Sequence, residues 1–192
     1  MPKPDRASEQ LTVRLTVRVA ATADVPALQV LIGLSVRGLS VGFYNDAQVE
    51  AAMTDVFGVD TQLIADGTYY VIDGPAGPVA AGGWSARRTL YGGDQLKPAD
   101  DPMLDPAADA ARIRAFFVHP EWARRGLARQ LYSACERAAA AAKFRRFELM
   151  ATLPGEPLYR ALGFTPIEQV VLTLGQGVAL PLVRMTRRID AA

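Results

Sequence analysis

Apolar and polar positions alternate without interruption over residues 11–19, close to the amino terminus. The odd positions are leucine or valine and the even positions are threonine or arginine. Strict alternation over this length predicts a strand with one buried face. The preceding residues 1–10 are polar and aperiodic, so we expect a flexible tail there and a single folded domain over residues 11–192.

Two helices are predicted after this strand. Apolar side chains recur at helical spacing after Thr22 and Asp24, either of which can cap a helix whose first turn tolerates Pro26. Asn45 and Gln48 stand three positions apart and predict a capping box. The second helix should end near Gly58, because glycine commonly terminates helices.

A hairpin and a long aperiodic segment follow. Residues 68–73 and 79–85 have strand character, and the glycines and prolines of residues 74–78 indicate a multi-residue loop between them. Gly82 and Gly83 permit another backbone to approach closely. Residues 86–108 contain several Gly, Pro and Asp without clear periodicity, which predicts a long loop that is either functional or flexible.

The second half of the chain is dominated by an apolar run and the helix after it. Residues 113–118 are apolar except for Arg114, which indicates a buried central strand. Residues 126–142 place their apolar side chains on one helical face. The remaining predicted elements are a strand at 147–151, a short helix at 156–162 and strands at 168–174 and 179–187. The order β-α-α-β-β-β-α-β-α-β-β, without repeats, predicts one α/β domain with a mixed sheet.

Composition excludes several classes of protein. Half of the 192 residues are apolar, which is enough for a sizeable core, and the formal net charge is only +1. Such a balance creates no strong field toward nucleic acid or anionic membranes. No apolar run approaches the roughly 18 residues that span a bilayer, and residues 1–10 are too polar for a signal peptide. We therefore expect a cytoplasmic protein without nucleic-acid or membrane partners.

Cysteine and histidine each occur once. Cys135 excludes an intrachain disulfide and falls on an apolar helix face, where it is interpreted as a small core residue. His119 cannot form a metal site alone, and no other cluster has ligand spacing, so no metal is expected. We interpret His119 as structural, and Trp84 as a core residue or a wall of an acceptor pocket.

The junction between the central strand and its helix has the chemistry of an anion site. Pro120 ends the strand, and Gly126 and Ala128 keep side chains away from the helix mouth. The unpaired N–H groups of the first turn and the helix dipole then favour an anion such as a pyrophosphate. Three cations flank the same mouth: Arg124, Arg125 and Arg129. On these residues alone, a plain strand-to-helix turn with exposed arginines is an equally good interpretation.

The surrounding sequence resembles the acetyl-CoA-binding motif of the GNAT (Gcn5-related N-acetyltransferase) superfamily. That signature is Arg/Gln-x-x-Gly-x-Gly/Ala after a strand ending in Val-x-Pro; residues 118–120 supply the strand end and 126–128 the second half of the signature. Ala123 departs from the first position. Residues 158–164, Leu-Tyr-Arg-Ala-Leu-Gly-Phe, are similar to the late tyrosine helix of the family, and residues 18–24 to its opening. The resemblance covers nearly the whole chain.

The resemblance implies a fold and an activity. The fold would be the GNAT α/β fold, with a mixed, mostly antiparallel sheet of about seven strands, flanked by about four helices and splayed at the central strands. The activity would be N-acetyltransfer from acetyl-CoA to a primary amine by direct attack in a ternary complex. A non-catalytic module that senses acyl-CoA is the alternative. A phosphate-binding α/β protein of another family would need a Walker or Gly-x-Gly-x-x-Gly motif, which is absent.

Roles for individual residues also follow from the resemblance. Tyr159 would protonate the leaving thiolate, since a phenol is protonated at neutral pH. The strand backbone would pair with the pantetheine arm, and Thr152 stands where relatives often carry an asparagine that contacts the cofactor. The residues expected to bind acetyl-CoA are Phe116, Phe117, Val118, Arg124, Arg125, Gly126, Leu127, Ala128, Arg129 and Thr152.

The acceptor side is left open by the sequence. The acceptor is a small-molecule or peptide amine, and a homodimer remains an alternative because dimers are common in the family. Segment 86–108 is either an insertion near the acceptor site or a disordered surface loop. The general base is a carboxylate or a water relay, because the central strand carries Arg114 where some relatives have a carboxylate. The candidate carboxylates are Glu148, Glu121, Asp105 and Asp109.

Overall fold

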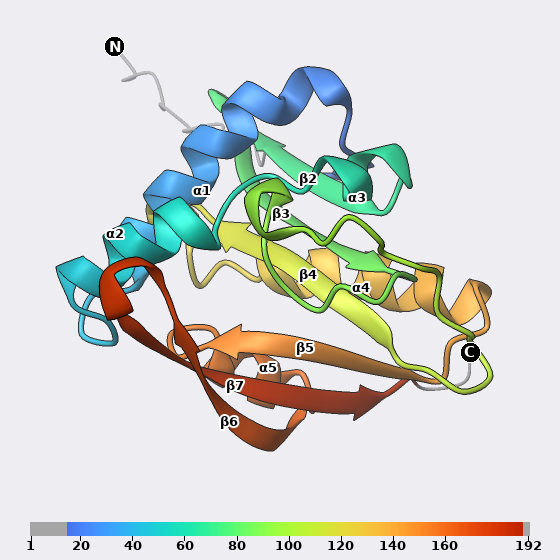
Figure 1. Ribbon diagram of the computed structural model, residues 1–192. Helices are drawn as coiled ribbons and strands as arrows, with labels where there is room; N and C mark the ends of the chain where they lie inside the picture. The colour runs from blue at the N-terminus through green and yellow to red at the C-terminus, as the bar shows by residue number, and fades with distance from the viewer. Residues whose placement is uncertain (1–14, 190–192) are drawn as a thin grey trace, which may run out of the picture.

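A computed structural model describes residues 15–189 of the chain (Figure 1), so the expected tail at residues 1–10 lies outside the described residues, as do residues 11–14. The strands are β1 (Val17–Val19), β2 (Tyr69–Gly74), β3 (Gly77–Ser85), β4 (Ala111–Val118), β5 (Arg146–Thr152), β6 (Thr165–Thr173) and β7 (Ala179–Arg188). The α-helices are α1 (Val25–Leu39), α2 (Asp46–Asp55), α3 (Thr61–Ala65), α4 (Leu127–Ala141) and α5 (Glu156–Ala161). Four 3-10 turns are η1 (Thr22–Asp24), η2 (Asp94–Leu96), η3 (Pro120–Trp122) and η4 (Gly175–Gly177).

The strands form one seven-stranded sheet in the order β1-β2-β3-β4-β5-β7-β6. Only β4 and β5 pair in parallel, and all other neighbouring strands are antiparallel. The predicted mixed, mostly antiparallel sheet is confirmed. The predicted order of elements holds too, with α3 as an additional short helix that the sequence pattern did not indicate.

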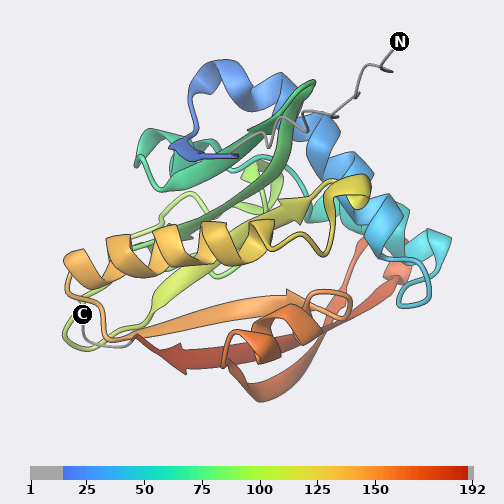
Figure 2. The same cartoon turned by 180° about the vertical axis from the view of Figure 1, so that it is seen from behind.

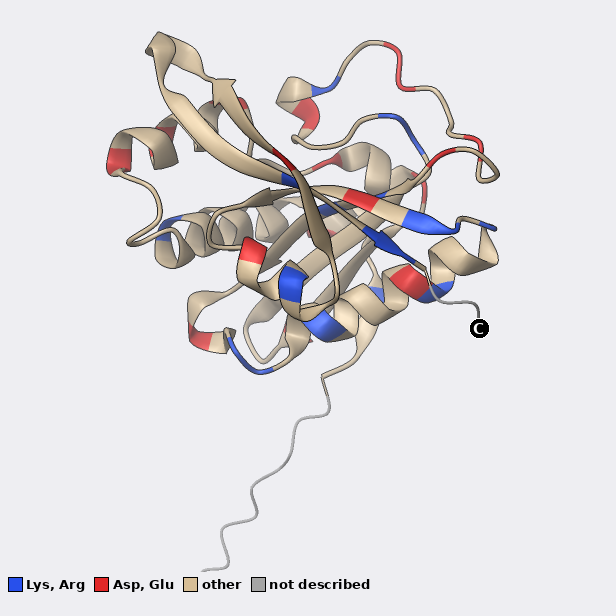
Figure 3. Cartoon of the chain, turned by 90° about the horizontal axis from the view of Figure 1, so that it is seen from below, with Lys and Arg blue, Asp and Glu red and all other residues tan. Residues whose placement is uncertain are grey.

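Helices cover both faces of the sheet. Buried residues of α1, α2 and α3 form one core against β2 and the end of β4, and buried residues of α4 and α5 form another core on the opposite face. Figures 1 and 2 show these two layers from opposite sides. In the cartoon of Figure 3, positions with Lys or Arg and positions with Asp or Glu are interspersed along the chain, whose formal net charge is +1. No helix in the described part of the chain is long and apolar enough to cross a membrane.

Local sequence signals determine the amino-terminal elements. The Asn45 side chain accepts a hydrogen bond from the Gln48 N–H at 2.9 Å, and the Gln48 amide oxygen accepts one from the Asn45 N–H at 3.0 Å, as the predicted capping box requires.

The strand β1 is shorter than predicted within the described residues. Val19 at its end is 50% exposed, so the buried face predicted for this strand is only partly covered.

The hairpin of β2 and β3 is tighter than the predicted five-residue loop, because Gly74 already pairs with Gly77. The prediction of close approach at the paired glycines is confirmed. A Cβ on Gly82 would lie 2.6 Å from the Phe116 ring, and one on Gly83 would lie 2.6 Å from the Thr68 carbonyl oxygen. Glycine at these two positions therefore lets the aromatic ring of β4 and the chain before β2 pack onto β3.

A bulge in β4 separates it from β5. The register with β3 shifts between Ala81 and Gly83, and the opposing Ala115 has a φ of 55°, unusual for a residue with a side chain. The Tyr69 hydroxyl donates to the Ala115 carbonyl oxygen at 3.1 Å, which fixes the bulge. β4 pairs with β5 only at Ala111 and Arg112 and diverges from it beyond them, so the predicted splay of the central strands is confirmed.

Candidate active site

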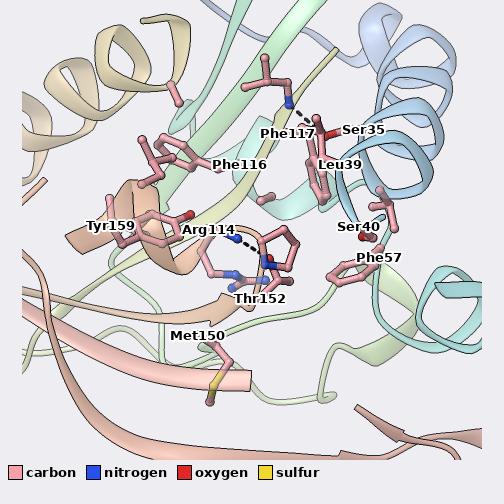
Figure 4. Close-up of a pocket in the computed structure, with 18 of the residues that line it drawn as sticks. Ser35, Leu39, Ser40, Phe57, Arg114, Phe116, Phe117, Met150, Thr152 and Tyr159 are labelled. Atoms are coloured by element: carbon pink, nitrogen blue, oxygen red, sulfur yellow. Dashed lines mark hydrogen bonds between the residues drawn. The ribbon is translucent and has the colours of Figure 1, made fainter. Parts of the chain in front are cut away.

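A cavity of about 660 Å³ opens where β4 and β5 diverge. Its walls come from β4, the start of α4, the end of α1, α5 and the segments 56–58 and 90–93. Figure 4 shows Phe116 and Tyr159 on one side of this cavity and Ser35, Leu39, Ser40 and Phe57 on the other. A volume of this size is typical of a small-molecule site.

The amino terminus of α4 opens into the cavity without a side-chain cap. Gly126 is the N-cap residue with a φ of 79°, and a Cβ placed on it would meet no atom within 4 Å. The N–H groups of the first turn therefore face open space, with the positive end of a 15-residue helix behind them. Leu127, Ala128 and two of the predicted arginines, Arg124 and Arg129, also line the cavity.

Arg125 differs from the other members of the predicted cofactor set. It does not line the cavity; its guanidinium carbon lies 4.8 Å from the centroid of the Trp122 ring, in a cation–π contact. The reason is the backbone at Arg124, whose φ of 64° reverses the direction of consecutive side chains. Arg125 thus lies outside the cavity lining, unlike the other residues predicted to bind the cofactor.

The edge of β4 facing the splay supplies Phe116, Phe117 and Val118 to the cavity wall. The Val118 N–H donates to the Ser35 hydroxyl of α1 at 3.1 Å, one of the dashed bonds in Figure 4. Phe117 meets the edge of Phe57 with ring centroids 6.2 Å apart. Along this edge, most backbone groups of β4 have no partner in β5. Val118, the last residue of β4, is bonded to α1 through Ser35.

Tyr159 lies in α5 with its ring among aromatic side chains and its hydroxyl toward the cavity. Its ring centroid is 6.3 Å from that of Phe116 and 5.7 Å from that of Phe164. Burial raises the pKa of the Tyr159 phenol well above its ordinary value, so the group stays protonated at neutral pH. Within the described residues no protein group bonds this hydroxyl, which leaves it free to donate to a ligand.

Thr152 at the end of β5 also lines the cavity, although its hydroxyl already has a partner. Both the hydroxyl and the carbonyl oxygen of Thr152 accept from the Gly155 N–H, at 3.2 and 3.0 Å. These bonds form the turn that leads into α5. Thr152 therefore positions the helix of Tyr159, besides lining the cavity as predicted.

Arg114, the single charged residue of the predicted apolar run, forms a buried ion pair. It is 3% exposed, and its guanidinium donates to Asp60 Oδ2 at 2.7 Å and to the carbonyl oxygens of Thr89 and Gly92 at 2.8 and 2.7 Å. Asp60 is 1% exposed and also pairs with Lys97. Burial lowers the pKa of Arg114 and Asp60 opposes the shift, yet a guanidinium remains charged in proteins.

These contacts dock the segment 86–108 on the sheet. Thr89, Gly92 and Lys97 belong to this segment, and Arg87 within it pairs with Asp66 at 2.7 Å. Leu90, Tyr91, Gly92 and Gly93 line the cavity. The segment is therefore ordered in the described structure, and its residues 90–93 form part of the cavity wall.

None of the candidate general bases lines the cavity. Glu148 accepts from Arg112 and from Arg184, each at 2.8 Å, so it is committed to two ion pairs. Glu121, Asp105 and Asp109 are also outside the lining, and no Asp or Glu occurs among the described residues that form it. The geometry offers no carboxylate to accept the amine proton.

The single histidine, the single cysteine and Trp84 have the structural places expected of them. His119 Nδ1 accepts from the Glu121 N–H at 3.2 Å and so caps η3. Cys135 is fully buried, and burial raises the pKa of its thiol. Trp84 is 6% exposed and packs edge-on against Phe144. Among the described residues, no three His, Cys, Asp or Glu side chains are placed to hold a metal ion.

Four residues of the site were not found by sequence reasoning: Asp60, Tyr69, Ser35 and Phe57. The sequence contained one signal for Asp60: an arginine inside an apolar strand predicts a buried anionic partner. That partner is 54 positions away along the chain, and nothing in the local sequence distinguishes Asp60 from the other aspartates. The other three have ordinary side chains whose role comes only from what they contact.

The comparisons with known proteins agree with this geometry. Residues 106–186 match the sequence profile described as "Acetyltransferase (GNAT) domain". This match includes β4, the start of α4 and Tyr159, whereas α1 to β3 and most of the insertion lie outside it. A search of curated protein sequences gives no significant match.

Solved structures share the whole fold at low identity. A GCN5-related N-acetyltransferase from Rhodopseudomonas palustris is 19% identical with a TM-score of 0.67, over 91% of this chain and 95% of that one. A phosphinothricin acetyltransferase from Sinorhizobium meliloti, solved with acetyl-CoA, is 20% identical with a TM-score of 0.60, over 92% and 89%. A putative acetyltransferase from Salmonella typhimurium, also with acetyl-CoA, is 19% identical with a TM-score of 0.59, over 93% and 95%. The chain therefore has the GNAT fold, and its residues 106–186 match the GNAT acetyltransferase domain family.

Proposed function

We propose that the protein transfers an acetyl group from acetyl-CoA to a primary amine by direct attack in a ternary complex. One observation carries this proposal. A single cavity connects the uncapped amino terminus of α4, the free edge of β4 and the unpartnered hydroxyl of Tyr159. An anion site, an edge for an extended chain and a proton donor thus lie in one continuous space.

The donor would occupy the side of the cavity formed by α4 and β4. Its pyrophosphate would take the first-turn N–H groups after Gly126, with Arg124 and Arg129 as neighbouring cations. Its pantetheine arm would pair with the backbone of Phe116 to Val118 as an added strand. An amide oxygen of the arm would then replace the Ser35 hydroxyl as acceptor for the Val118 N–H, exchanging one hydrogen bond for another. Two structural relatives solved with acetyl-CoA support this choice of donor.

In this reaction the protein supplies one proton-transfer group, the hydroxyl of Tyr159. The amine nitrogen attacks the thioester carbonyl carbon, the carbon–sulfur bond breaks, and the sulfur takes a proton from Tyr159. The attacking nitrogen releases a proton to water, and the phenol regains one from solvent, so the products are the acetamide and free thiol. A phenol whose pKa is raised by burial is always in the protonated form that this step needs.

A sensing module without turnover is the alternative. The Tyr159 hydroxyl faces the cavity, and the cavity continues past it to the wall formed by the insertion, leaving room for an acceptor. Both features favour catalysis. Incubation with acetyl-CoA and a panel of amines, with free thiol as the readout, tests the proposal. Binding without thiol release from any amine would favour the sensor.

Acetyl-CoA is expected to stabilise the fold by mass action. At a hundredfold excess over Kd, a ligand contributes about 2.7 kcal/mol. In a domain of this size that contribution raises Tm by roughly 5–10 °C. A thermal melt with and without acetyl-CoA measures the shift. No shift at millimolar acetyl-CoA would contradict the donor assignment.

Gly126→Asp is expected to weaken acetyl-CoA binding about tenfold to a hundredfold relative to Gly126→Asn. Asn and Asp both tolerate a positive φ and both cap helices, so the two variants should fold alike. Only the aspartate places a negative charge where the pyrophosphate would bind, and close like charges cost a few kcal/mol. Titration calorimetry compares the two variants. Equal affinities would place the phosphates elsewhere.

A further inference from the structure

The wall opposite α4 is apolar and aromatic. Phe43, Phe57 and Tyr91 line it, with Phe117 meeting Phe57 edge to face at 6.2 Å. These side chains come from the chain after α1, the segment after α2 and the insertion, three places that meet only in the fold. Aromatic surfaces of this kind bind apolar and aromatic bodies through buried area and edge contacts.

The described residues that line the same space include no carboxylate. The titratable groups lining the cavity are Arg114, Arg124, Arg129, Tyr91 and Tyr159, and no Asp, Glu, Lys or His is among the described residues that line it. Burial holds the phenol of Tyr159 in its neutral form. Because Arg124 and Arg129 are assigned to the pyrophosphate of the donor, the acceptor would meet apolar surface, the buried Arg114 and no carboxylate.

The carboxylate that bonds Arg114 does not change this balance. Asp60 is 1% exposed and pairs with both Arg114 and Lys97. Its oxygens also accept from the backbone N–H groups of Gln62 and Leu63, at 3.1 and 3.4 Å. The carboxylate of Asp60 is thus fully committed to its own partners and does not line the cavity, so it is not available to pair with an ammonium there.

An ammonium entering this space would lose water and find no anion, which is unfavourable. A neutral amine bears no such cost. Desolvation lowers the pKa of an ammonium, so an apolar environment without a carboxylate favours the deprotonated form that attacks a thioester. This accounts for a site without a carboxylate base. A second positive charge on the acceptor would meet the same unfavourable surroundings with no compensation.

We propose that the acceptor is a small primary amine bound as the free base, joined to an aromatic or branched apolar body and without a second positive charge. This proposal rests on the acetyltransferase function proposed above. It distinguishes the site from one for polyamines, aminoglycosides or lysine-rich peptides, whose several cations need carboxylate partners.

The first test compares 2-phenylethylamine with 1,6-diaminohexane as acceptors, with free thiol as the readout. We expect kcat/KM at least about tenfold higher for the aromatic amine, since one methylene-sized apolar contact alone discriminates about tenfold or more. For that amine, log kcat/KM should rise with pH at unit slope until the pKa of the amine itself. An equal or higher value for the diamine, or no thiol release with the aromatic amine, would overturn the proposal.

The two proposals fail in different ways. If acetyl-CoA neither raises Tm nor yields thiol with any amine, the acetyltransferase function is wrong. If acetyl-CoA raises Tm and only polycationic amines release thiol, the function stands and the acceptor class is wrong.

A matched pair of variants tests the charge argument directly. Phe43 is 48% exposed at the edge of the cavity, so Phe43→Glu and Phe43→Gln should both fold. The glutamate variant should raise kcat/KM for 1,6-diaminohexane about five- to tenfold over the glutamine variant, with the same acetyl-CoA-induced shift in Tm. Equal diamine activity in the two variants would show that missing negative charge does not exclude cations here.

Discussion

Tyr159→Phe is expected to lower kcat about a hundredfold while leaving acetyl-CoA affinity within about threefold. The substitution removes one oxygen that has no protein partner in the described structure and keeps the ring contacts with Phe116 and Phe164. The leaving thiolate would then lack its proton donor. General acid catalysis spans about 10² to 10⁴, and a thiol leaves readily, so we expect the lower end. Single-turnover kinetics at saturating acetyl-CoA measures the chemical step directly.

The control for this variant is Tyr132→Phe. Tyr132 is an equally buried tyrosine of α4 whose hydroxyl bonds Glu136 and which does not line the cavity. Removing the Tyr132 hydroxyl should lower the free energy of unfolding and leave kcat unchanged. Full activity of Tyr159→Phe with chemistry shown to be rate-limiting would reduce Tyr159 to a packing residue. Loss of acetyl-CoA binding instead would mean that the hydroxyl holds the thioester.

Arg114→Met is expected to lower the free energy of unfolding by about 3 kcal/mol, the lower end for breaking a buried ion pair. Methionine replaces the apolar stem of the arginine but not its guanidinium. The change leaves Asp60 buried with only Lys97 as a cation and the carbonyl oxygens of Thr89 and Gly92 without their donor. Urea unfolding followed by circular dichroism measures the change. The apolar cavity wall formed by the insertion should loosen with it, raising KM for the acceptor more than for acetyl-CoA.

A double-mutant cycle separates the ion pair from packing. Asp60→Asn removes the negative charge and keeps the shape, so the double variant Arg114→Met/Asp60→Asn should be less destabilised than the sum of the two single variants. Lys97→Met is the milder comparison, because the Lys97 side chain is 18% exposed and its charge is partly hydrated. Additive single effects would show that Arg114 and Asp60 are not energetically coupled.

The elements of the fold and the donor side of the site were determined by local sequence. Alternation and helical spacing predicted the strands and the longer helices, because burial of one face imposes a period on the residues. The Asn45 capping box was predicted from two side chains three positions apart, and it formed. Gly126 and Tyr159 were identified from short motifs, since an open helix mouth and a tyrosine helix each need only consecutive residues.

The features that only the tertiary structure decided depend on pairs of residues that are far apart along the chain. The bulge at Ala115 is held by a hydrogen bond from Tyr69, 46 positions away, and the buried Arg114 is paired with Asp60, 54 positions away. Val118 is held by Ser35, 83 positions away. No period or motif encodes such pairs, because strand order and packing choose which residues meet. The apolar wall of the cavity has the same origin. It combines the chain after α1, the segment after α2 and residues 90–93, whose side chains share no pattern in sequence and come together only when the sheet brings them to one cavity.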